Sequence, residues 1–515
     1  MKTGVFATVL VMLSGLAVGQ TQPAPTPTPA PTPAPTNPAP TPAPNTPPAD
    51  NKPAPRQPRV PRVPVVKPGD TKAGAQKKEL PFWGPWVVRE DPNDILVQVR
   101  VQVRSDNPKQ KETFRDPFSG KTLQMPVVTP FNFDAVSMVW PYITTTAGSD
   151  LLGETKPWPD GDIGEVGFKG RFTISDRIVD DEPTIVDNNY PNGSRYSTWQ
   201  APKEVVERVK AAGGAVREAG LVVEYPVRCY KVRFDEDAAN SVGWPGEWPA
   251  DAASTLETPQ MWIEKGVTVE GKAAEYPPEE MAGVLKAYLN EERIEDVKKV
   301  APARLAKILT GKVWRDVAPN QGAGIKSTRR GALEGFELQR PSETFKSGRG
   351  STHDMVVALV ALLREAEIPA RIVIGVDSGS GGGGLGGSRE QVSLRTWAEF
   401  ALFDEGSNAM CWVPIDILKL RKISSKPQKL DAKWRYFGHN DELDQVAPMS
   451  FNFTPPVDGV VTYGAPEMWG WMVFPQAPAF VDSFVTFSTG GVPKKASKEL
   501  KEVEPIKVRQ VEKGK

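Results

Sequence analysis

Residues 348–377 read GRGSTHDMVVALVALLREAEIPARIVIGVD, and this stretch decides the fold. It opens on Ser351 and Thr352 with Asp354 close behind, which is the S/T-x-x-[DE] pattern of a helix N-terminus. Apolar residues recur as far as Leu363, and they predict a buried or amphipathic helix over residues 353–365. The IPAR turn that follows ends this helix and leads into the apolar run IVIGV.

Two further segments continue the pattern along the chain. RTWAEFALFD occupies residues 395–404 and CWVPIDI occupies residues 411–417. The whole frame resembles the transglutaminase-like superfamily, in which a Cys opens a helix, LLR and a GIPAR-like turn follow, one strand carries His-x-Trp and another ends in WxxxD. In this alignment the Cys position falls on Thr352, the His position on Arg395 and the Asp position on Asp416.

The resemblance extends to scaffold positions around these three. Arg364 and Arg371 match the arginines of LLR and PAR, while Trp397, Glu399 and Trp412 match residues of the two strands. The resemblance implies an α+β fold. We expect a transglutaminase-like (papain-like) domain of helices packed on an antiparallel sheet, preceded by a β-rich domain.

The family positions lack the groups that catalysis needs. In such a site a cysteine thiolate attacks, a histidine accepts the proton and an aspartate orients the imidazole. The Thr352 hydroxyl ionises far less readily than a thiol, and the Arg395 guanidinium stays protonated and cannot act as a base. We therefore assign no catalytic residue, and we predict a partly buried salt bridge between Arg395 and Asp416 in place of the His–Asp pair.

Several alternatives at this site remain open. Either Ser351 or Thr352 can cap the helix, and we favour that role over a nucleophile. His353 is expected on the surface or at the cap, although it could face the cleft. A hydrolase that pairs Ser351 with His439 is a further alternative. The candidate binding residues are Ser351, His353, Trp397 and Trp412.

The beginning of the chain has the features of an exported protein. Residues 1–19 resemble a secretory signal peptide, with Lys2 ahead of an apolar run and small residues before Gln20. Residues 20–79 form a linker rich in Pro, Ala and Thr, which cannot bury a core and favours extended polyproline II. We expect a periplasmic, cell-surface or secreted protein with no transmembrane span after signal cleavage.

The remaining sequence divides into two predicted domains and a tail. Residues 80–260 are rich in strand patterns, such as the alternation in DILVQVRVQVR at 94–104, and are expected to form the β-rich domain. Residues 261–490 are assigned to the transglutaminase-like domain with its C-terminal strands. Residues 491–515 are assigned to a charged, flexible tail.

Local signals add further expectations. KEVVERVKAAGGAVREA at 203–219 predicts one helix, interrupted or capped at its central glycines. The Trp/Pro-rich passage 244–263 predicts a linker, and Pro302 is expected to divide a helical pattern in two. The glycine-rich segment 378–388 predicts a flexible loop or a lid, because it lacks the Gly-Lys-Ser/Thr ending of a phosphate loop.

Composition limits the classes of partner. The chain has 515 residues with 63 basic and 63 acidic side chains, a balance that does not indicate nucleic acid as a partner. The two cysteines, Cys229 and Cys411, favour separate buried thiols over a disulfide. We find no zinc-ligand spacing in the sequence, and we expect no metal and no cofactor.

These observations favour an exported, catalytically inactive transglutaminase-like protein. Its role would be to bind a peptide or protein, such as a cell-envelope component. The alternatives are an active acyltransferase or peptidase with a non-standard Ser or Thr nucleophile, and a structural surface protein whose cleft is filled.

Overall fold

A computed structural model provides the structure of the chain. It describes residues 84–104, 106–116, 119–128, 135–152, 169–175, 177–180, 185–187, 194–211, 218–257, 260, 278–322, 324–327, 332–378, 394–453, 468–474 and 482–492. Residues 77–515 form one compact unit. The predicted signal peptide, the Pro/Ala/Thr-rich linker, nearly all of the glycine-rich segment and the tail after residue 492 lie outside the described residues.

The largest sheet is built around two long antiparallel strands, β1 (Val87–Arg104) and β11 (Glu218–Phe234). The valines at 97, 99, 101 and 103 of β1 are all buried, which confirms the alternation seen in the sequence. The strand order is β12 (Ile325–Ser327), β13 (Leu333–Phe336), β19 (Asp482–Gly491), β1, β11, β6 (Ser149–Leu151) and β5 (Thr145–Thr146), with β7 (Lys169–Ile174) beside β11 and β8 (Arg177–Asp180) beside β7.

A second, four-stranded sheet contributes aromatic side chains to the same hydrophobic core. Trp140 and Trp199 lie on neighbouring strands, are fully buried and pack in one cluster with the β1 valines. Rings of this size bury much apolar area, so they contribute strongly to the stability of the β-rich region. The sheet order is β18 (Gly470–Phe474), β4 (Ala135–Ile143), β10 (Ser194–Ala201) and β9 (Ile185–Asp187), and β2 (Asp106–Arg115) pairs separately with β3 (Thr122–Val128).

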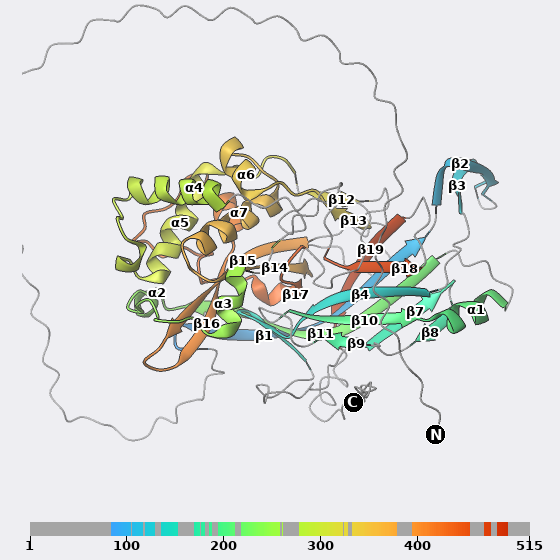
Figure 1. The fold of residues 1–515 in the computed structure, drawn as a ribbon, viewed down its shortest axis with the longest axis horizontal. Coiled ribbons are helices and arrows are strands. Elements are labelled where there is room, and N and C mark those ends of the chain that lie inside the picture. The colour runs from blue at the N-terminus through green and yellow to red at the C-terminus, as the bar shows by residue number, and fades with distance from the viewer. Residues whose placement is uncertain are drawn as a thin grey trace, which may run out of the picture. The chain divides into compact units, whose positions relative to one another are not determined.

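The third sheet is antiparallel and is accompanied by helices, as Figure 1 shows. The predicted central helix is α7 (Thr352–Glu365), and it contacts two of the strands, β14 and β15. The strand order is β16 (Ala409–Ile415), β15 (Leu394–Asp404), β14 (Ala370–Asp377) and β17 (Val446–Ser450), and the surrounding helices are α4 (Pro278–Glu291), α5 (Pro302–Asp316), α6 (Pro341–Ser347) and α8 (Ile417–Ile423). This confirms the predicted α+β architecture, with a β-rich region ahead of it.

Local predictions had mixed outcomes. The helix predicted over 203–219 was too long, because α1 ends at Ala211 and pairing with β1 places Glu218 at the start of β11. The passage predicted as a linker contains α3 (Ala250–Glu257), which contacts β14. Pro302 does divide the helical pattern, since it opens α5 after the short 3-10 helix η3 (Val297–Lys299). The remaining short elements are α1 (Lys203–Ala211), α2 (Glu236–Ala239) and η4 (Leu443–Gln445).

The strand β19 joins the end of the described chain to its beginning. It pairs with β1 along its whole length, from Asp482 opposite Arg104 to Gly491 opposite Ile95. The predicted boundary between the later domain and the tail, at residues 490 and 491, falls within β19. The division near residue 260 stays a prediction.

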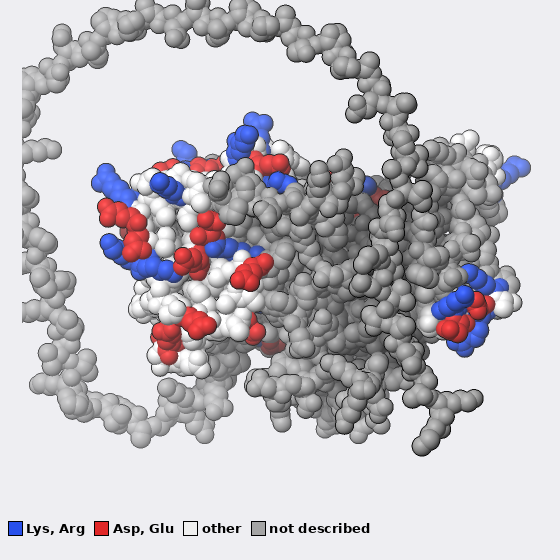
Figure 2. Space-filling model, viewed as in Figure 1, with Lys and Arg blue, Asp and Glu red and all other residues white. Residues whose placement is uncertain are grey.

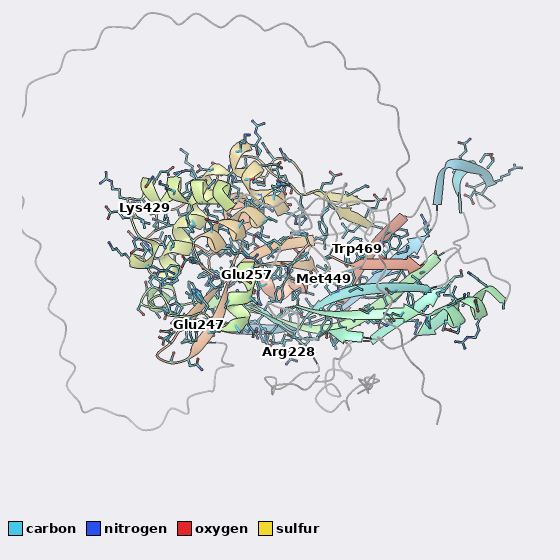
Figure 3. The ribbon with its side chains drawn as sticks, viewed as in Figure 1. Arg228, Glu247, Glu257, Lys429, Met449 and Trp469 are labelled. Carbon is cyan, nitrogen blue, oxygen red and sulfur yellow. The ribbon has the colours of Figure 1, made fainter. Side chains whose placement is uncertain are left out.

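The surface and the interior differ as expected for a chain with balanced charge. Figure 2 shows basic and acidic side chains interspersed over the helical part. In α5 and α4, Arg315 forms an ion pair with Glu291, and both side chains are exposed. Exposed pairs of this kind contribute little to stability. In the interior, Met449 and Trp469, both labelled in Figure 3, are fully buried.

Candidate functional site

The start of α7 is closed by a capping box. The Ser351 hydroxyl oxygen accepts a hydrogen bond from the Asp354 N–H at 3.1 Å, and the Asp354 carboxylate accepts one from the Ser351 N–H at 2.7 Å. The other carboxylate oxygen of Asp354 accepts from the Gln339 N–H at 2.9 Å. The predicted cap is therefore confirmed, with Ser351 as the capping residue and Thr352 as the first helical residue.

A backbone strap, described at residues 318–322 and 324, crosses this helix start. The Thr352 N–H donates to the Gly322 carbonyl at 3.0 Å, and the Gln321 N–H donates to the Gly350 carbonyl at 3.0 Å. The N–H groups at a helix start are the natural donors for an anion or a developing oxyanion. At the nucleophile position this donor is already bonded to the carbonyl of the strap.

The strap needs glycine where it approaches Ser351. Gly324 has a positive φ of 66°, a conformation that side chains with a Cβ rarely adopt. A Cβ built at Gly324 would lie 2.5 Å from the Ser351 hydroxyl oxygen. The close contact between strap and cap thus depends on this glycine.

The predicted ion pair between Arg395 and Asp416 is present. Both Nε and Nη2 of Arg395 donate to Oδ2 of Asp416, at 2.9 and 2.6 Å. The two side chains are only 8% and 1% exposed. The other carboxylate oxygen of Asp416 accepts from the Lys419 N–H at 3.0 Å and so caps α8. Both oxygens at the family's Asp position are therefore occupied.

The ion pair keeps Arg395 charged. Burial is the largest single influence on the pKa of Arg395, and it lowers that pKa. The charge and hydrogen bonds of Asp416, with smaller contributions from other carboxylates, together outweigh burial, so the pKa lies above its ordinary value. The Glu442 carboxylate adds a second contact, with its Oε2 at 3.5 Å from Nη1 of Arg395, and also forms an ion pair with Lys419. No proton acceptor is available at the family's His position.

His353 does not lie on the surface, and that prediction was wrong. Its ring is 2% exposed and packs edge-on against Phe336 and Phe453, with ring centres 5.4 Å away in each case. The reason is that α7 is buried on nearly every side, so a side chain at its second residue, His353, has no direction that leads to solvent. Burial lowers the pKa of His353 to about 4.

The imidazole of His353 has one hydroxyl neighbour. Its Nδ1 lies 2.7 Å from the Thr396 hydroxyl oxygen, while Nε2 has no hydrogen-bond partner in the described part of the chain. Thr396 is 1% exposed. A hydroxyl–imidazole pair is thus present, at a threonine that sequence reasoning did not select, and both members are covered by the core.

The other candidate nucleophiles and bases lie elsewhere. His439 contacts the Arg233 guanidinium and lies 3.6 Å from the Asp441 carboxylate, so its ring is not paired with Ser351. Cys229 and Cys411 are free and buried, which confirms two separate core thiols. Burial raises the pKa of both thiols well above the usual range, so neither is a reactive thiolate.

The two tryptophans proposed for binding are buried. Trp397 is 1% and Trp412 is 4% exposed, so neither ring is presented to solvent. The Arg371 guanidinium lies between Trp412 and Phe451, about 4 Å from each ring centre. It also forms a buried ion pair at 2.7 Å with Glu399. In this arrangement Trp412 holds an internal cation rather than an external ligand.

Glu399 joins the sheet of α7 to the β-rich region. Its second oxygen accepts a hydrogen bond from the Ala147 N–H at 2.9 Å, in the turn between β5 and β6. The same turn is held by Arg89, which donates to the Ala147 carbonyl at 3.0 Å and forms an ion pair with Asp150. Arg371 and Glu399, which match scaffold positions of the transglutaminase-like pattern, thus have a structural role in this chain.

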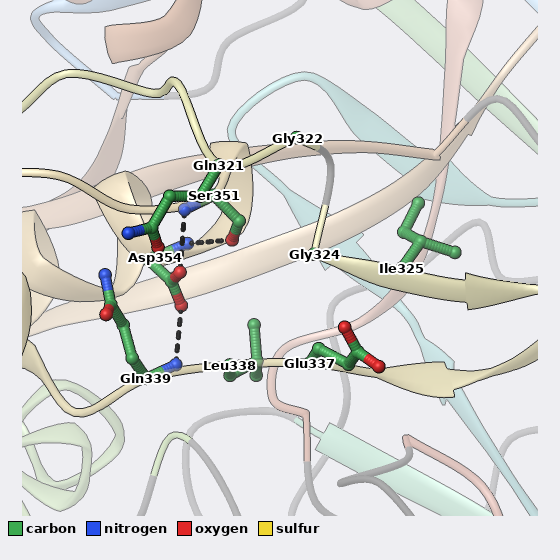
Figure 4. A pocket seen from close by; sticks show the side chains of 9 residues that line it. All are labelled: Gln321, Gly322, Gly324, Ile325, Glu337, Leu338, Gln339, Ser351 and Asp354. Atoms are coloured by element: carbon green, nitrogen blue, oxygen red, sulfur yellow. Dashed lines mark hydrogen bonds between the residues drawn. The ribbon is translucent and has the colours of Figure 1, made fainter.

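One pocket opens beside the capped helix (Figure 4), and sequence reasoning had missed it. Its volume is about 470 Å³, within the range of small-ligand sites. It is lined by Gln321, Gly322, Gly324, Ile325, Glu337, Leu338, Gln339, Ser351 and Asp354. Of the predicted binding residues only Ser351 lines it. The other lining residues come from the strap, from Ile325 in β12, from residues 337–339 directly after β13, and from Asp354 in α7. The approach of the strap, β12 and residues 337–339 to α7 leaves no motif in the sequence.

The described residues were also compared with the requirements of a metal site and of a membrane-spanning helix. Among the described residues, His, Cys, Asp and Glu side chains do not gather in a group that could hold a metal ion. The described helices also include none whose length and apolar character would allow it to cross a membrane.

Comparison with known proteins gives one family match. Residues 327–417 match the model of the transglutaminase-like superfamily, a range that includes α7, β14, β15, β16 and Asp416. No curated protein matches the chain.

Two solved structures are similar in part. One is named "Putative Cysteine Protease" from Cytophaga hutchinsonii, with 8% identity, a TM-score of 0.41, and coverage of 79% of this chain and 93% of that chain. The other is a "putative protease" from Parabacteroides distasonis, with 9% identity, a TM-score of 0.19, and coverage of 62% and 59%.

Proposed function

Residues 327–417 carry the core of the transglutaminase-like superfamily, and from this premise we propose that the protein binds a peptide or protein segment without turning it over. The observation that carries the proposal is the buried Arg395–Asp416 ion pair, in which a permanent cation occupies the family's base position. A guanidinium cannot accept the proton that a Thr352 hydroxyl would have to lose.

The start of α7 supports the same proposal. Ser351 is used as a helix cap, and the Thr352 N–H is bonded to the Gly322 carbonyl. A nucleophile at Thr352 would therefore lack both a base and a free backbone donor for the oxyanion. Two separate requirements for acyl transfer, the base and the oxyanion donor, are unmet at one position.

We extend the proposal to location and partner. The signal-like residues 1–19 and the Pro/Ala/Thr-rich linker 20–79 support an exported protein whose folded part stands away from a surface. The ligand is then a peptide or protein of the cell envelope or the extracellular space.

One observation favours a second candidate, an acyltransferase or peptidase with a threonine nucleophile. The Thr396 hydroxyl lies 2.7 Å from an imidazole nitrogen of His353, a distance suited to proton transfer. Against it, both side chains are buried, and a substrate carbonyl would have to displace core side chains to reach them.

A peptide-capture experiment tests the leading proposal. The full chain is incubated with a mixed peptide pool, bound peptides are recovered, and their masses are compared with those of the input. We expect a reproducible bound subset whose masses are unchanged, because the site holds ligand without a nucleophile.

Variants separate the two candidates. Recovery of cleaved or amine-modified peptides from the wild type, and their loss in Thr396→Ala or Thr352→Ala, would establish the enzyme instead. Failure to retain any peptide above a control protein would reject the binding proposal.

A further inference from the structure

The pocket beside the cap of α7 has an uncompensated acidic character. Among the described residues that line it, Glu337 and Asp354 are the two ionisable ones, and these lining residues include no lysine or arginine. Asp354 is 2% exposed, and its two oxygens accept only backbone N–H groups, from Ser351 and Gln339. Its negative charge is therefore balanced by backbone dipoles and not by a cation.

Glu337 differs from Asp354 because its carboxylate is free. It is exposed, and within the described ranges it forms no ion pair and no side-chain hydrogen bond; its backbone N–H alone is used, donating to the Gly324 carbonyl at 2.8 Å. In Figure 4 the Glu337 side chain stands out from the chain just after β13, and no dashed line reaches its oxygens. A free carboxylate at the mouth of a cavity is a ready partner for a ligand cation.

The rest of the lining suits a long side chain with a charged end. Ile325 and Leu338 are the two large apolar residues, and both are partly exposed. The Gln339 side-chain N–H₂ donates to the Arg349 carbonyl, which leaves its amide oxygen as an acceptor. An aliphatic stem can pack on Ile325 and Leu338 while its charged end reaches Glu337.

We infer that this pocket binds a lysine side chain of a peptide or protein ligand, with Glu337 as the partner of the ammonium group. The inference rests on the proposed binding function and specifies its ligand. The strap separates this site from the Thr352 position, because the Gly322 carbonyl occupies the Thr352 N–H, so the bound amine has no acyl group to accept.

The test uses three acetylated and amidated pentapeptides with glycines around a central residue. That residue is lysine, its uncharged analogue norleucine with the same stem, or glutamate. Binding to the full chain is measured by titration calorimetry at millimolar peptide. We expect the lysine peptide to bind about tenfold more tightly than the norleucine peptide, which corresponds to about 1.4 kcal/mol. The affinity of the lysine peptide should fall as salt is added.

Matched variants locate the site. Glu337→Gln should reduce lysine-peptide affinity about tenfold, equal to the loss of one charged contact. Glu334→Gln removes a carboxylate from β13 that does not line the pocket, and it should leave affinity unchanged. Both variants should unfold at the temperature of the wild type, because the Glu337 side chain has no ion pair or hydrogen bond to lose within the described part of the chain.

The outcomes separate this inference from the proposed function. Equal binding of the lysine and norleucine peptides, or an unchanged affinity in Glu337→Gln, overturns the inference. Binding of only the glutamate peptide overturns it too, yet supports a peptide-binding function. If the three peptides and the mixed pool all fail to bind, the inference and the proposed function fail together.

Discussion

The start of α7 and the junction of β15 with β16 are the two halves of the candidate site, and they depart from the transglutaminase-like pattern in different ways. At the helix start, Ser351 and the strap satisfy the backbone through short local hydrogen bonds beside an open pocket. At the strand junction, Arg395 and Asp416 form a buried ion pair. The first half can lose a contact at modest cost, whereas loss of Asp416 from the second leaves the buried Arg395 guanidinium with only the longer contact to Glu442.

The largest expected effect comes from breaking the strand half. Asp416→Ala leaves the Arg395 guanidinium buried without its carboxylate and should destabilise the protein by about 3–5 kcal/mol in urea unfolding. The double variant Arg395→Met/Asp416→Asn removes both charges and keeps a capping side chain for α8, so it should recover most of that loss. Equal losses in the single and double variants would contradict a coupled pair.

The second effect is a pH dependence from the helix half. Burial holds the pKa of His353 at about 4 in the folded chain, against an ordinary value of 6.5. The unfolded chain therefore binds the proton more readily, and stability present above pH 6.5 is lost as pH falls toward 4, by up to about 3 kcal/mol. His353→Leu combined with Thr396→Val should flatten this part of the pH–stability curve. An unchanged curve would show that other groups cause the acid loss.

A third comparison probes the strap with two glycines. Gly324→Ala should cost about 2 kcal/mol or more, because positive φ and contact with the Ser351 hydroxyl act together. Gly322 also has a positive φ, of 80°, but among the described residues no atom lies within 4 Å of the Cβ that Gly322→Ala adds, so this variant should cost less. Denaturant midpoints of the two variants measure the difference. The reverse order would mean that the strap does not press on the cap.

The smallest effect concerns the cap itself. Ser351→Ala should destabilise the protein by about 1 kcal/mol, the usual loss when a helix cap is removed. Ser351→Asp keeps a capping acceptor for the Asp354 N–H and should restore part of it, although it adds a carboxylate near Asp354. A Ser351→Ala loss as large as that of Asp416→Ala would remove the contrast between the two halves.

The sequence predicted those features that depend on residue type and regular spacing. The family frame predicted α7, the Arg395–Asp416 pair and the cap, because each follows from a side chain at a known register. It did not predict the strap, whose contacts are backbone hydrogen bonds between residues 318–322 and 348–352 and carry no side-chain signature.

Two other misses have related physical causes. His353 was expected at the surface because it follows a polar cap, but a helix buried on nearly all sides gives no outward face. Glu337 belongs to no sequence motif. It stands out only in the folded chain, where its carboxylate has no ion pair or hydrogen bond within the described residues. Such features depend on packing between distant segments, which single-sequence patterns do not report.

Product formation by the wild-type chain tests the central claim most directly. The assay follows the incorporation of a fluorescent amine into a glutamine-bearing protein, with Thr352→Ala measured beside the wild type. We predict no incorporation above background by the wild type or by Thr352→Ala, because the candidate site holds neither a thiolate nor a base. Incorporation by the wild type that disappears in Thr352→Ala would contradict this prediction.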